Sequence, residues 1–344
     1  MTEVTSYRLT VREIVRETGD SCSVLLEPAA EDAATFAYQP GQFLTLRLPV
    51  GDTAVGRCYS LCSSPHTDDG LRIAVKRVVD GVGSNWINEH LQVGDQVECL
   101  PPTGVFTPRS LDDDLLLFAG GSGITPVLSI LKSALHTGTG RVVLVYANQH
   151  ERSVIFAEQL RELAAKHPDR LHVVHWLESV QGLPSRPQLR ALAAPFTSYS
   201  AFVCGPSPFM ESVTHVLREL GVPPSRIHVE RFQSLAVDPF APVAAAAVES
   251  ADAATAQLEV DLDGEQHTFA WPTQTKLLDF LLAQGLKAPF SCRQGACSAC
   301  ACIVDEGEVK MLHNEILEQD DLAEGFVLAC QAVPISERVR VRYS

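Results

Sequence analysis

Four cysteines near the C-terminus have the spacing of iron–sulfur ligands. Cys292, Cys297 and Cys300 follow the pattern Cys-x4-Cys-x2-Cys, and Cys330 comes later in the chain. This arrangement is the plant-type pattern for a [2Fe-2S] cluster. Glycine, alanine and serine occupy most of the gaps between the first three cysteines, as a tight loop around a cluster requires. The pattern therefore predicts a cluster that carries electrons.

Two other uses of these cysteines remain open, a structural zinc site and reduced thiols in a core. Zinc sites usually pair two Cys-x2-Cys knuckles, and this segment has one. Cys302 alternates with Cys300 along a predicted strand, which indicates a buried small residue and not a ligand. The sequence has no Cys-x-His pair, so it lacks the ligands of a Rieske cluster.

A second group of residues predicts an anion-binding strand and turn nearer the N-terminus. Arg57, Tyr59 and Ser60 share one predicted strand, on which alternation places Arg57 and Tyr59 on one side and Ser60 on the other. Lys76 follows on a later strand, and Gly83-Ser84 lies in a turn that opens a short helix. Backbone N–H groups at such a turn can bind a pyrophosphate.

A third group lies at predicted strand ends in the middle of the chain. The segment from Gly120 to Pro126, with Gly123 and Thr125, follows a buried strand and opens a helix, so its turn can bring backbone donors to a dinucleotide. Cys204-Gly205-Pro206 ends another strand. An ordinary dinucleotide-binding half has an acidic residue at the end of the next strand, where this chain has Tyr146-Ala147-Asn148. The turn therefore departs from the standard fingerprint.

The elements around these residues predict three domains and a linker. Short β runs separated by glycine and proline in residues 1–111 predict an antiparallel β-barrel. Strands and helices alternate in residues 112–235, as in a parallel α/β domain. Residues 236–255, rich in alanine, proline and valine, predict a flexible linker. Residues 256–344 begin with two strands around an Asp263-Gly264 turn and then a helix, the order expected for a β-grasp ferredoxin domain.

Composition limits the partners and the setting. The formal net charge of −15 argues against nucleic acid, since phosphate backbones need basic surfaces. Residues 256–344 contain 14 Asp and Glu against 7 Lys and Arg, which suits either a basic protein partner or a solvated acidic surface. The sequence shows no signal peptide and no uninterrupted apolar stretch of membrane length, so we expect a cytoplasmic protein that does not enter a membrane.

Taken in order, these three groups resemble those of the ferredoxin-reductase superfamily, and the whole chain is similar to the reductase components of multicomponent oxygenases. The resemblance implies that Arg57 pairs with the flavin phosphate, that Tyr59 packs on the isoalloxazine ring and that the Ser60 hydroxyl reaches its N5 edge. It places Lys76 and the Gly83-Ser84 turn in the same flavin site, with the turn at the pyrophosphate.

On the nicotinamide side, the resemblance implies that Thr125, in the turn with Gly123, approaches both flavin and nicotinamide. Cys204 flanks the position of hydride transfer, and Gly205-Pro206 admits the nicotinamide ring. Glu230 helps to position the reacting rings, although a strand-end glutamate is more often solvated. Phe232 lies against the flavin until the nicotinamide displaces it.

The implied cofactors are FAD, a [2Fe-2S] cluster and NADH. FMN in place of FAD and NADPH in place of NADH stay open. Arg152 and Ser153 follow the second strand of the predicted α/β domain and could hold the 2′-phosphate of NADPH.

The implied partner is a Rieske-type terminal oxygenase on another polypeptide. The segments Cys58 to Pro65, Leu177 to Pro184 and Asp238 to Phe240 look most like the reductases of 3-ketosteroid 9α-hydroxylases in steroid degradation. The reductase of a phenylacetyl-CoA epoxidase is the nearest alternative. An alternative of another class is a zinc-stabilised binding module fused to an inactive reductase.

Overall fold

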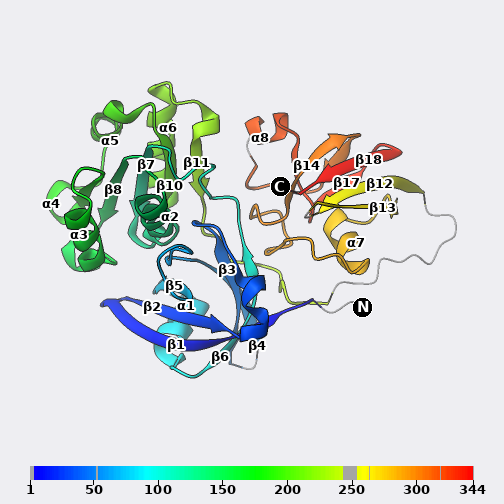
Figure 1. Cartoon of the computed structure of the whole chain (residues 1–344), viewed down its shortest axis with the longest axis horizontal. Coiled ribbons are helices and arrows are strands. Elements are labelled where there is room, and N and C mark those ends of the chain that lie inside the picture. The colour runs from blue at the N-terminus through cyan, green and yellow to red at the C-terminus, as the bar shows by residue number, and fades with distance from the viewer. Residues whose placement is uncertain (1–3, 52, 243–253, 263, 318, 344) are drawn as a thin grey trace. The chain divides into compact units, whose positions relative to one another are not determined.

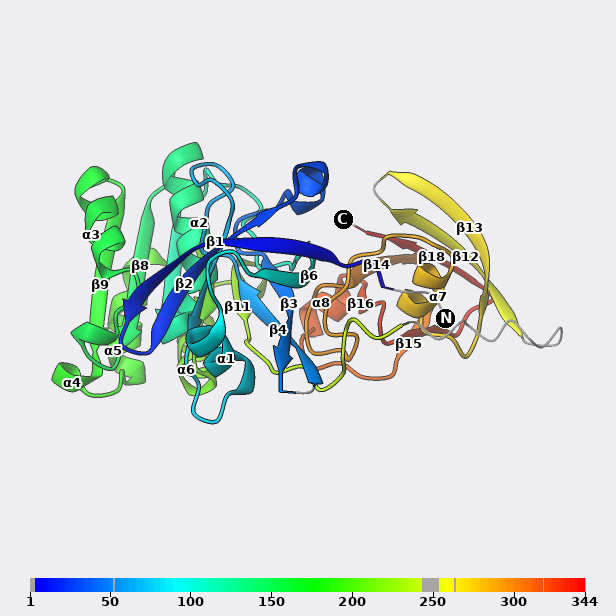
Figure 2. The ribbon, with the colours of Figure 1, turned by 90° about the horizontal axis from the view of Figure 1, so that it is seen from below.

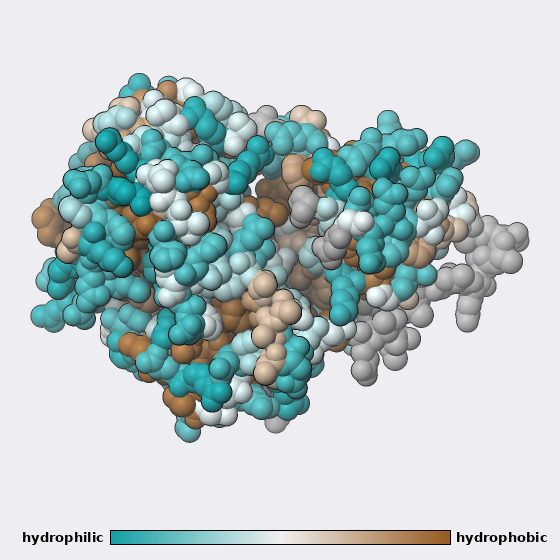
Figure 3. All heavy atoms as spheres, viewed as in Figure 1, coloured by the Kyte–Doolittle hydropathy of each residue, from teal (hydrophilic) through white to brown (hydrophobic). Residues whose placement is uncertain are grey.

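The computed structural model describes residues 4–51, 53–242, 254–262, 264–317 and 319–343. The chain divides into two compact units. One unit comprises residues 7–232, and the other comprises residues 233–344 together with residues 1–6. Among the residues that the structure describes, no helix is both long enough and apolar enough to cross a membrane. Figure 3 shows that hydrophilic side chains dominate the viewed face of each unit.

The larger unit begins with a six-stranded antiparallel sheet in the order β4-β3-β6-β1-β2-β5 (Figure 1). A β-bridge between Leu61, directly after β4, and Ile73 of β5 joins the two edge strands and closes the sheet into the predicted barrel. The barrel core is a cluster of leucine, isoleucine and valine side chains from alternate strand positions. Its elements are β1 (Tyr7–Thr18), β2 (Ser21–Pro28), η1 (Ala30–Phe36), β3 (Phe43–Val50), β4 (Thr53–Ser60), β5 (Leu71–Lys76), α1 (Val82–His90) and β6 (Gln96–Thr103).

The rest of the larger unit is a five-stranded parallel sheet in the order β11-β10-β7-β8-β9. All six residues of β7 are buried, because one core cluster packs on each face of the sheet. The strands are β7 (Leu115–Gly120), β8 (Val142–Asn148), β9 (Leu171–Leu177), β10 (Ser200–Cys204) and β11 (Ile227–Glu230). The α-helices are α2 (Ile124–Thr137), α3 (Ala157–Lys166), α4 (Glu178–Gln181), α5 (Arg186–Ala193) and α6 (Ser207–Glu219). Short 3-10 turns are η2 (Gly121–Gly123), η3 (Glu151–Ser153), η4 (Ala194–Phe196) and η5 (Pro224–Arg226).

The smaller unit contains a five-stranded mixed sheet in the order β13-β12-β18-β14-β16, whose strands β13, β12 and β18 lie side by side in Figure 2. β12 and β13 form the predicted hairpin, in which Leu262 pairs with Glu265; Asp263 of the predicted turn lies outside the described residues. α7 packs its leucines into the core around the fully buried Trp271. The elements are β12 (Thr255–Leu262), β13 (Glu265–Pro272), α7 (Leu277–Ala283), β14 (Ala301–Glu306), β15 (Val309–Met311), α8 (Gln319–Ala323), β16 (Phe326–Leu328), β17 (Ala332–Pro334) and β18 (Arg338–Arg342).

The predicted linker, residues 236–255, is only partly described. Residues 243–253 lie outside the described residues, and β12 begins at Thr255. Residues 236–242 do not behave as a free linker, because they make several hydrogen bonds to the cysteine-rich loop of the smaller unit. The predicted domain boundaries at 111/112, 235/236 and 255/256 stay predictions.

Candidate active site and cluster site

The predicted flavin residues meet around the first turn of α1. An ideal Cβ atom on Gly83 would lie 2.9 Å from Cγ of Arg57 and 3.2 Å from Oη of Tyr59. Glycine therefore lets α1 approach the side of β4 that carries both side chains, as alternation along the strand predicts. The Ser84 hydroxyl accepts a hydrogen bond from the backbone N–H of Val78 at 3.1 Å. Because this hydroxyl builds the turn, the turn's backbone N–H groups are the better candidates for a phosphate.

Ser60 and Lys76 end two strands of the barrel, β4 and β5. Ser60 is buried at the end of β4, where it pairs with Phe43. Nζ of Lys76 lies 3.6 Å from Oδ2 of Asp20 and 4.0 Å from the place where a Cβ atom of Gly121 would stand. The structure thus brings Lys76 of the barrel beside the glycine turn of the α/β domain, although about 45 positions separate Lys76 from Gly121 in sequence.

The glycine turn after β7 packs backbone to backbone against the turn after β10. A Cβ atom on Gly123 would lie 2.2 Å from the carbonyl oxygen of Cys204, and one on Gly205 would lie 3.0 Å from Cα of Gly120. Pro206, which begins the turn into α6, lies against Gly120 as well. The order of strands reverses between β7 and β10, and ligands of open α/β sheets bind at such a switch point, at the carboxyl ends of the strands.

Thr125, Cys204, Glu230 and Phe232 lie at or near this carboxyl edge. Thr125 is buried in the first turn of α2, where its hydroxyl donates to the Ser122 carbonyl at 3.0 Å. Cys204 and Glu230 are register neighbours on β10 and β11. Phe232 follows β11 and is 50% exposed, so about half of its surface is open to a ligand.

The acid–base properties of Cys204 and Glu230 follow from their burial. Cys204 is 1% exposed, and burial, with a smaller effect of the Glu230 charge, raises the pKa of its thiol well above 9.0. It is therefore a neutral thiol at neutral pH and not a nucleophilic thiolate. Glu230 is half-buried by its surface area, and desolvation raises its pKa from 4.5 to about 8. A protonated Glu230 can donate a hydrogen bond at neutral pH.

This pKa shift predicts how the stability of the larger unit depends on pH. The carboxyl group binds its proton more tightly in the folded protein, where its pKa is about 8, than in the unfolded chain, where it is near 4.5. The free energy of unfolding should therefore fall as pH rises between these values, relative to a Glu230→Gln variant that does not titrate. Urea unfolding of both proteins at about pH 5 and about pH 8.5 measures this difference. If the two proteins differ in free energy of unfolding by the same amount at both pH values, the raised pKa of Glu230 is contradicted.

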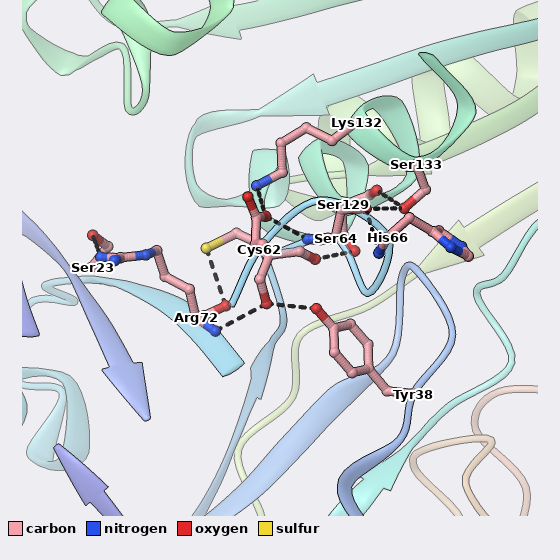
Figure 4. Close-up of polar contacts among 11 residues, drawn as sticks. Ser23, Tyr38, Cys62, Ser64, His66, Arg72, Ser129, Lys132 and Ser133 are labelled. Carbon is pink, nitrogen blue, oxygen red and sulfur yellow. Dashed lines mark hydrogen bonds and ion pairs between the residues drawn. The ribbon is translucent and has the colours of Figure 1, made fainter. Parts of the chain in front are cut away.

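A loop directly after the flavin strand is fixed to α2, a junction that no pattern in the sequence had predicted. The Ser63 hydroxyl accepts hydrogen bonds from the Tyr38 hydroxyl at 2.7 Å and from the Arg72 backbone N–H at 3.0 Å (Figure 4). The Ser129 hydroxyl of α2 donates to the Ser63 carbonyl at 2.6 Å. The hydroxyls of Ser64 and Ser133 lie 2.8 Å apart.

An ion pair strengthens the same junction. Lys132 of α2 is 7% exposed and pairs with Asp68, which also accepts a hydrogen bond from the Ser64 backbone N–H. These contacts hold α2, which carries the glycine turn, in a fixed position relative to the strand that carries Arg57, Tyr59 and Ser60. The polar residues Ser129, Lys132 and Ser133, set among the apolar residues of α2, are a signal in the sequence that could have indicated this junction.

The four predicted cluster ligands come together in the smaller unit. The Cys292 thiol interacts with those of Cys297 and Cys330, and the Cys330 thiol interacts in turn with that of Cys300. These interactions lower the pKa of Cys292 and raise the pKa of Cys297 and of Cys330, so Cys292 is the thiol of this group that ionises first. The thiols meet pairwise: within the described residues, no three His, Cys, Asp or Glu side chains form a preformed site for a single metal ion.

The backbone around these thiols fits a cluster of sulfur-bound iron. The backbone N–H of Cys330 donates to Sγ of Cys300 at 3.4 Å, and that of Gln294 donates to Sγ of Cys292 at 3.5 Å. Gly295 has a φ of +82°, and a Cβ atom there would lie 2.9 Å from the carbonyl oxygen of His313. Cys302 is buried on β14 in the core of the unit, consistent with a packing role.

Comparisons with known proteins match the three parts in the predicted order. A family model for the oxidoreductase FAD-binding domain matches residues 10–107, one for the oxidoreductase NAD-binding domain matches residues 117–215, and one for the 2Fe-2S iron–sulfur cluster binding domain matches residues 260–334. The solved structure of a phthalate dioxygenase reductase, at 21% identity, covers 98% of both chains with a TM-score of 0.57 and supports the fold. The three-domain fold class is confirmed.

Two curated relatives cover almost the whole chain. The "3-ketosteroid-9-alpha-monooxygenase, ferredoxin reductase component" of Rhodococcus rhodochrous is 54% identical over 98% of this chain and 97% of the relative. A component of the 1,2-phenylacetyl-CoA epoxidase of Escherichia coli is 32% identical over 98% of each chain. The protein is therefore an NAD(P)H-dependent flavin and iron–sulfur oxidoreductase with FAD-, NAD- and 2Fe-2S-binding domains. Within this class, the chain belongs to the family of the ferredoxin reductase components of oxygenase systems, together with the Rhodococcus protein.

The cofactor predictions agree with these matches. FAD accepts hydride as an electron pair and releases electrons one at a time, and the [2Fe-2S] cluster carries single electrons. The 2Fe-2S domain match and the complete FAD and NAD domains argue against the zinc-stabilised binding module.

Proposed function

We propose that this protein is the reductase component of a 3-ketosteroid 9α-hydroxylase in steroid degradation, that it works in the cytoplasm, and that a Rieske-type terminal oxygenase accepts its electrons. The observation that carries the proposal is the 54% identity to the Rhodococcus component, against 32% to the phenylacetyl-CoA epoxidase component, over nearly the same length of chain. The resemblance places the same cofactor residues in both kinds of reductase, so we expect the difference to lie in segments outside them.

The site residues have distinct roles in this proposal. Arg57 binds the flavin phosphate, Tyr59 covers the ring, and the buried Ser60 orients its hydroxyl toward the ring's N5 edge. Lys76 and the turn of Gly83 and Ser84 complete the flavin site. The proximity of Arg57 and Tyr59 to Gly83 supports this assignment.

On the nicotinamide side, Gly123 keeps the two strand-end turns in contact, and Gly205 and Pro206 leave room for the ring beside them. Thr125 and Cys204 line the position of hydride transfer, with Cys204 as a neutral group that excludes water. Protonated Glu230 orients the nicotinamide through a hydrogen bond, and the exposed Phe232 covers the flavin when nicotinamide is absent. The strand-end placement of Cys204 and Glu230 and the raised pKa of Glu230 support these roles.

Reduction potentials favour the proposed direction of electron flow. Plant-type clusters have potentials of about −400 mV, whereas Rieske centres lie at about −150 to +300 mV, so transfer to a Rieske centre is downhill. The acidic balance of residues 256–344 would steer the encounter with a basic acceptor, and the transfer rate should fall as salt is added.

Reconstitution tests the partner. We expect this protein, with NADH, to support product formation by a 3-ketosteroid 9α-hydroxylase oxygenase. A phenylacetyl-CoA epoxidase assayed in parallel should turn over at least about tenfold more slowly, since partner discrimination is a difference of binding free energies. Efficient turnover with the epoxidase and none with the steroid oxygenase would contradict the assignment of the partner and leave the reductase chemistry intact.

The turn after β8 predicts a preference for NADH. The Ser153 hydroxyl is buried and donates to the His150 carbonyl at 2.7 Å, so it is not available to a 2′-phosphate. Arg152 is exposed in the same turn and would act alone. We expect kcat/KM to be at least about tenfold higher with NADH than with NADPH, because the charged 2′-phosphate of NADPH finds no set of hydrogen-bond donors in this turn. Arg152→Ala should leave the NADH value unchanged; equal values for the two cofactors in the wild type would refute the preference.

A further inference from the structure

The segment that follows the larger unit in sequence is bound to the loop that contains Cys292, Cys297 and Cys300, which we call the cluster loop. We define the docked segment as residues 233–242, which belong to the smaller unit. The backbone N–H groups of Ala236 and Val237 both donate to Oε1 of Gln294, at 3.0 and 3.2 Å. Gln294 lies between the ligands Cys292 and Cys297. One side chain of the cluster loop therefore holds two consecutive residues of the segment.

Three further contacts fix the same segment. Nη1 of Arg293 donates to the Ala241 carbonyl at 2.8 Å, and its Nη2 contacts Asp279 of α7 at 3.0 Å. The Gln233 side-chain amide, with its nitrogen facing the acceptors, donates to the Ala296 carbonyl and to Glu315, both at 3.2 Å. Phe240 is 7% exposed. The segment is thus held at its beginning, middle and end.

Arg293 adds an observation that a passive contact would not require. Its φ is +55°, in the left-handed region that residues with a side chain seldom adopt. This backbone geometry places the guanidinium of Arg293 between Ala241 and Asp279. Its carbonyl accepts a hydrogen bond from Gln331, the neighbour of the ligand Cys330, at 3.2 Å. The cluster loop and the docked segment are therefore parts of one hydrogen-bonded network.

We propose that Gln294 and Arg293 are positioning residues for electron transfer from FAD to the cluster, because they anchor the docked segment and so shorten the tether between the two units. This inference rests on the proposed electron path through FAD and the cluster. A free linker of 20 residues has a root-mean-square length of about 25 Å. The four-residue path from Phe232 to Ala236 extends at most about 14 Å. Anchoring at Gln294 thus reduces the free chain that links the two units to the few residues between Phe232 and Ala236.

Gln294→Ala in the cluster-loaded full-length protein tests the anchor. We expect amide exchange at Ala236 and Val237 to rise about tenfold, as for the loss of a hydrogen bond. NADH-driven reduction of a dye that takes electrons from the flavin should not change, nor should the absorbance and potential of the cluster. Reduction of the cluster by NADH, followed by stopped flow, should slow by about tenfold. Gln294→Glu, which keeps the acceptor oxygen, should restore the rate.

Two other variants complete the experiment. Phe240→Ala loosens the docked segment from its own side and should reproduce the slower cluster reduction with an unchanged cluster spectrum. Gln266→Ala, an exposed glutamine of β13 in the same unit, is the matched control and should behave as wild type.

Normal cluster reduction or normal amide exchange in Gln294→Ala would overturn the proposal. A lost or shifted cluster in that variant would overturn it too, because Gln294 would then act on the cluster itself. No oxygenase takes part in these measurements, so a wrong partner assignment cannot be mistaken for a failed anchor. Absence of NADH-driven dye reduction in the wild type and in every variant would instead contradict the flavin site of the proposed function.

Discussion

Replacing Cys300 with serine is expected to remove the iron–sulfur cluster. The Cys300 thiol accepts a hydrogen bond from the Cys330 backbone N–H at 3.4 Å, so it lies beside the other predicted ligands. A serine hydroxyl is a poor ligand for the soft iron–sulfur centre. We expect the visible absorbance of the cluster to disappear and reduction of the protein acceptor to fall at least about a hundredfold. NADH-driven reduction of flavin-accepting dyes should persist, because the FAD and NAD domains lie in the other unit.

Cys302→Ser provides the matched control, two residues away on β14. Its thiol is buried in the core of the smaller unit, and serine is a small residue of nearly the same size as cysteine. We expect this variant to keep its iron and its acceptor activity. Loss of iron from Cys302→Ser together with normal iron content in Cys300→Ser would contradict the ligand assignment.

Adding one methyl group at Gly123 is expected to disable the nicotinamide site. Gly123 has φ and ψ of −60° and −8°, which alanine adopts easily, so the backbone itself imposes no strain. The new Cβ atom would lie 2.2 Å from the Cys204 carbonyl oxygen. An ordinary contact needs about 3.3 Å, so the two turns must separate by about 1 Å. Such a displacement in an active site can cost about a hundredfold in rate. We expect the rate of FAD reduction by NADH to fall by that factor.

Two measurements separate this effect from general unfolding. Flavin content should be retained in Gly123→Ala, since the predicted flavin residues lie on the barrel. Gly19→Ala is the control, because a Cβ atom on Gly19 meets no atom within 4 Å. Reduction of Gly123→Ala at the wild-type rate would show that the close approach of the two turns is not needed for catalysis.

The sequence determined the chemistry of this protein because that chemistry depends on local spacing. The pattern of Cys292, Cys297 and Cys300 fits one loop around a cluster, and the later Cys330 joins them as predicted. Alternation along β4 put Arg57 and Tyr59 on one side of the strand, and a run of buried residues identified the central strand β7. The order of barrel, α/β domain and β-grasp domain followed from the same periodicities.

Tertiary structure decided what depends on contacts between distant segments. The backbone contact between Gly123 and Cys204 and the hydroxyl pair of Ser64 and Ser133 join segments about 70 to 80 residues apart, and no local pattern reports such distances. Composition predicted a free linker from residue 236, because alanine and proline carry no side chain that signals a partner. Two partners of that stretch are the side chains of Arg293 and Gln294, and the Gln294 oxygen accepts two backbone N–H groups. Only folding brings that oxygen to Ala236 and Val237, so the anchoring of the segment was decided by the structure.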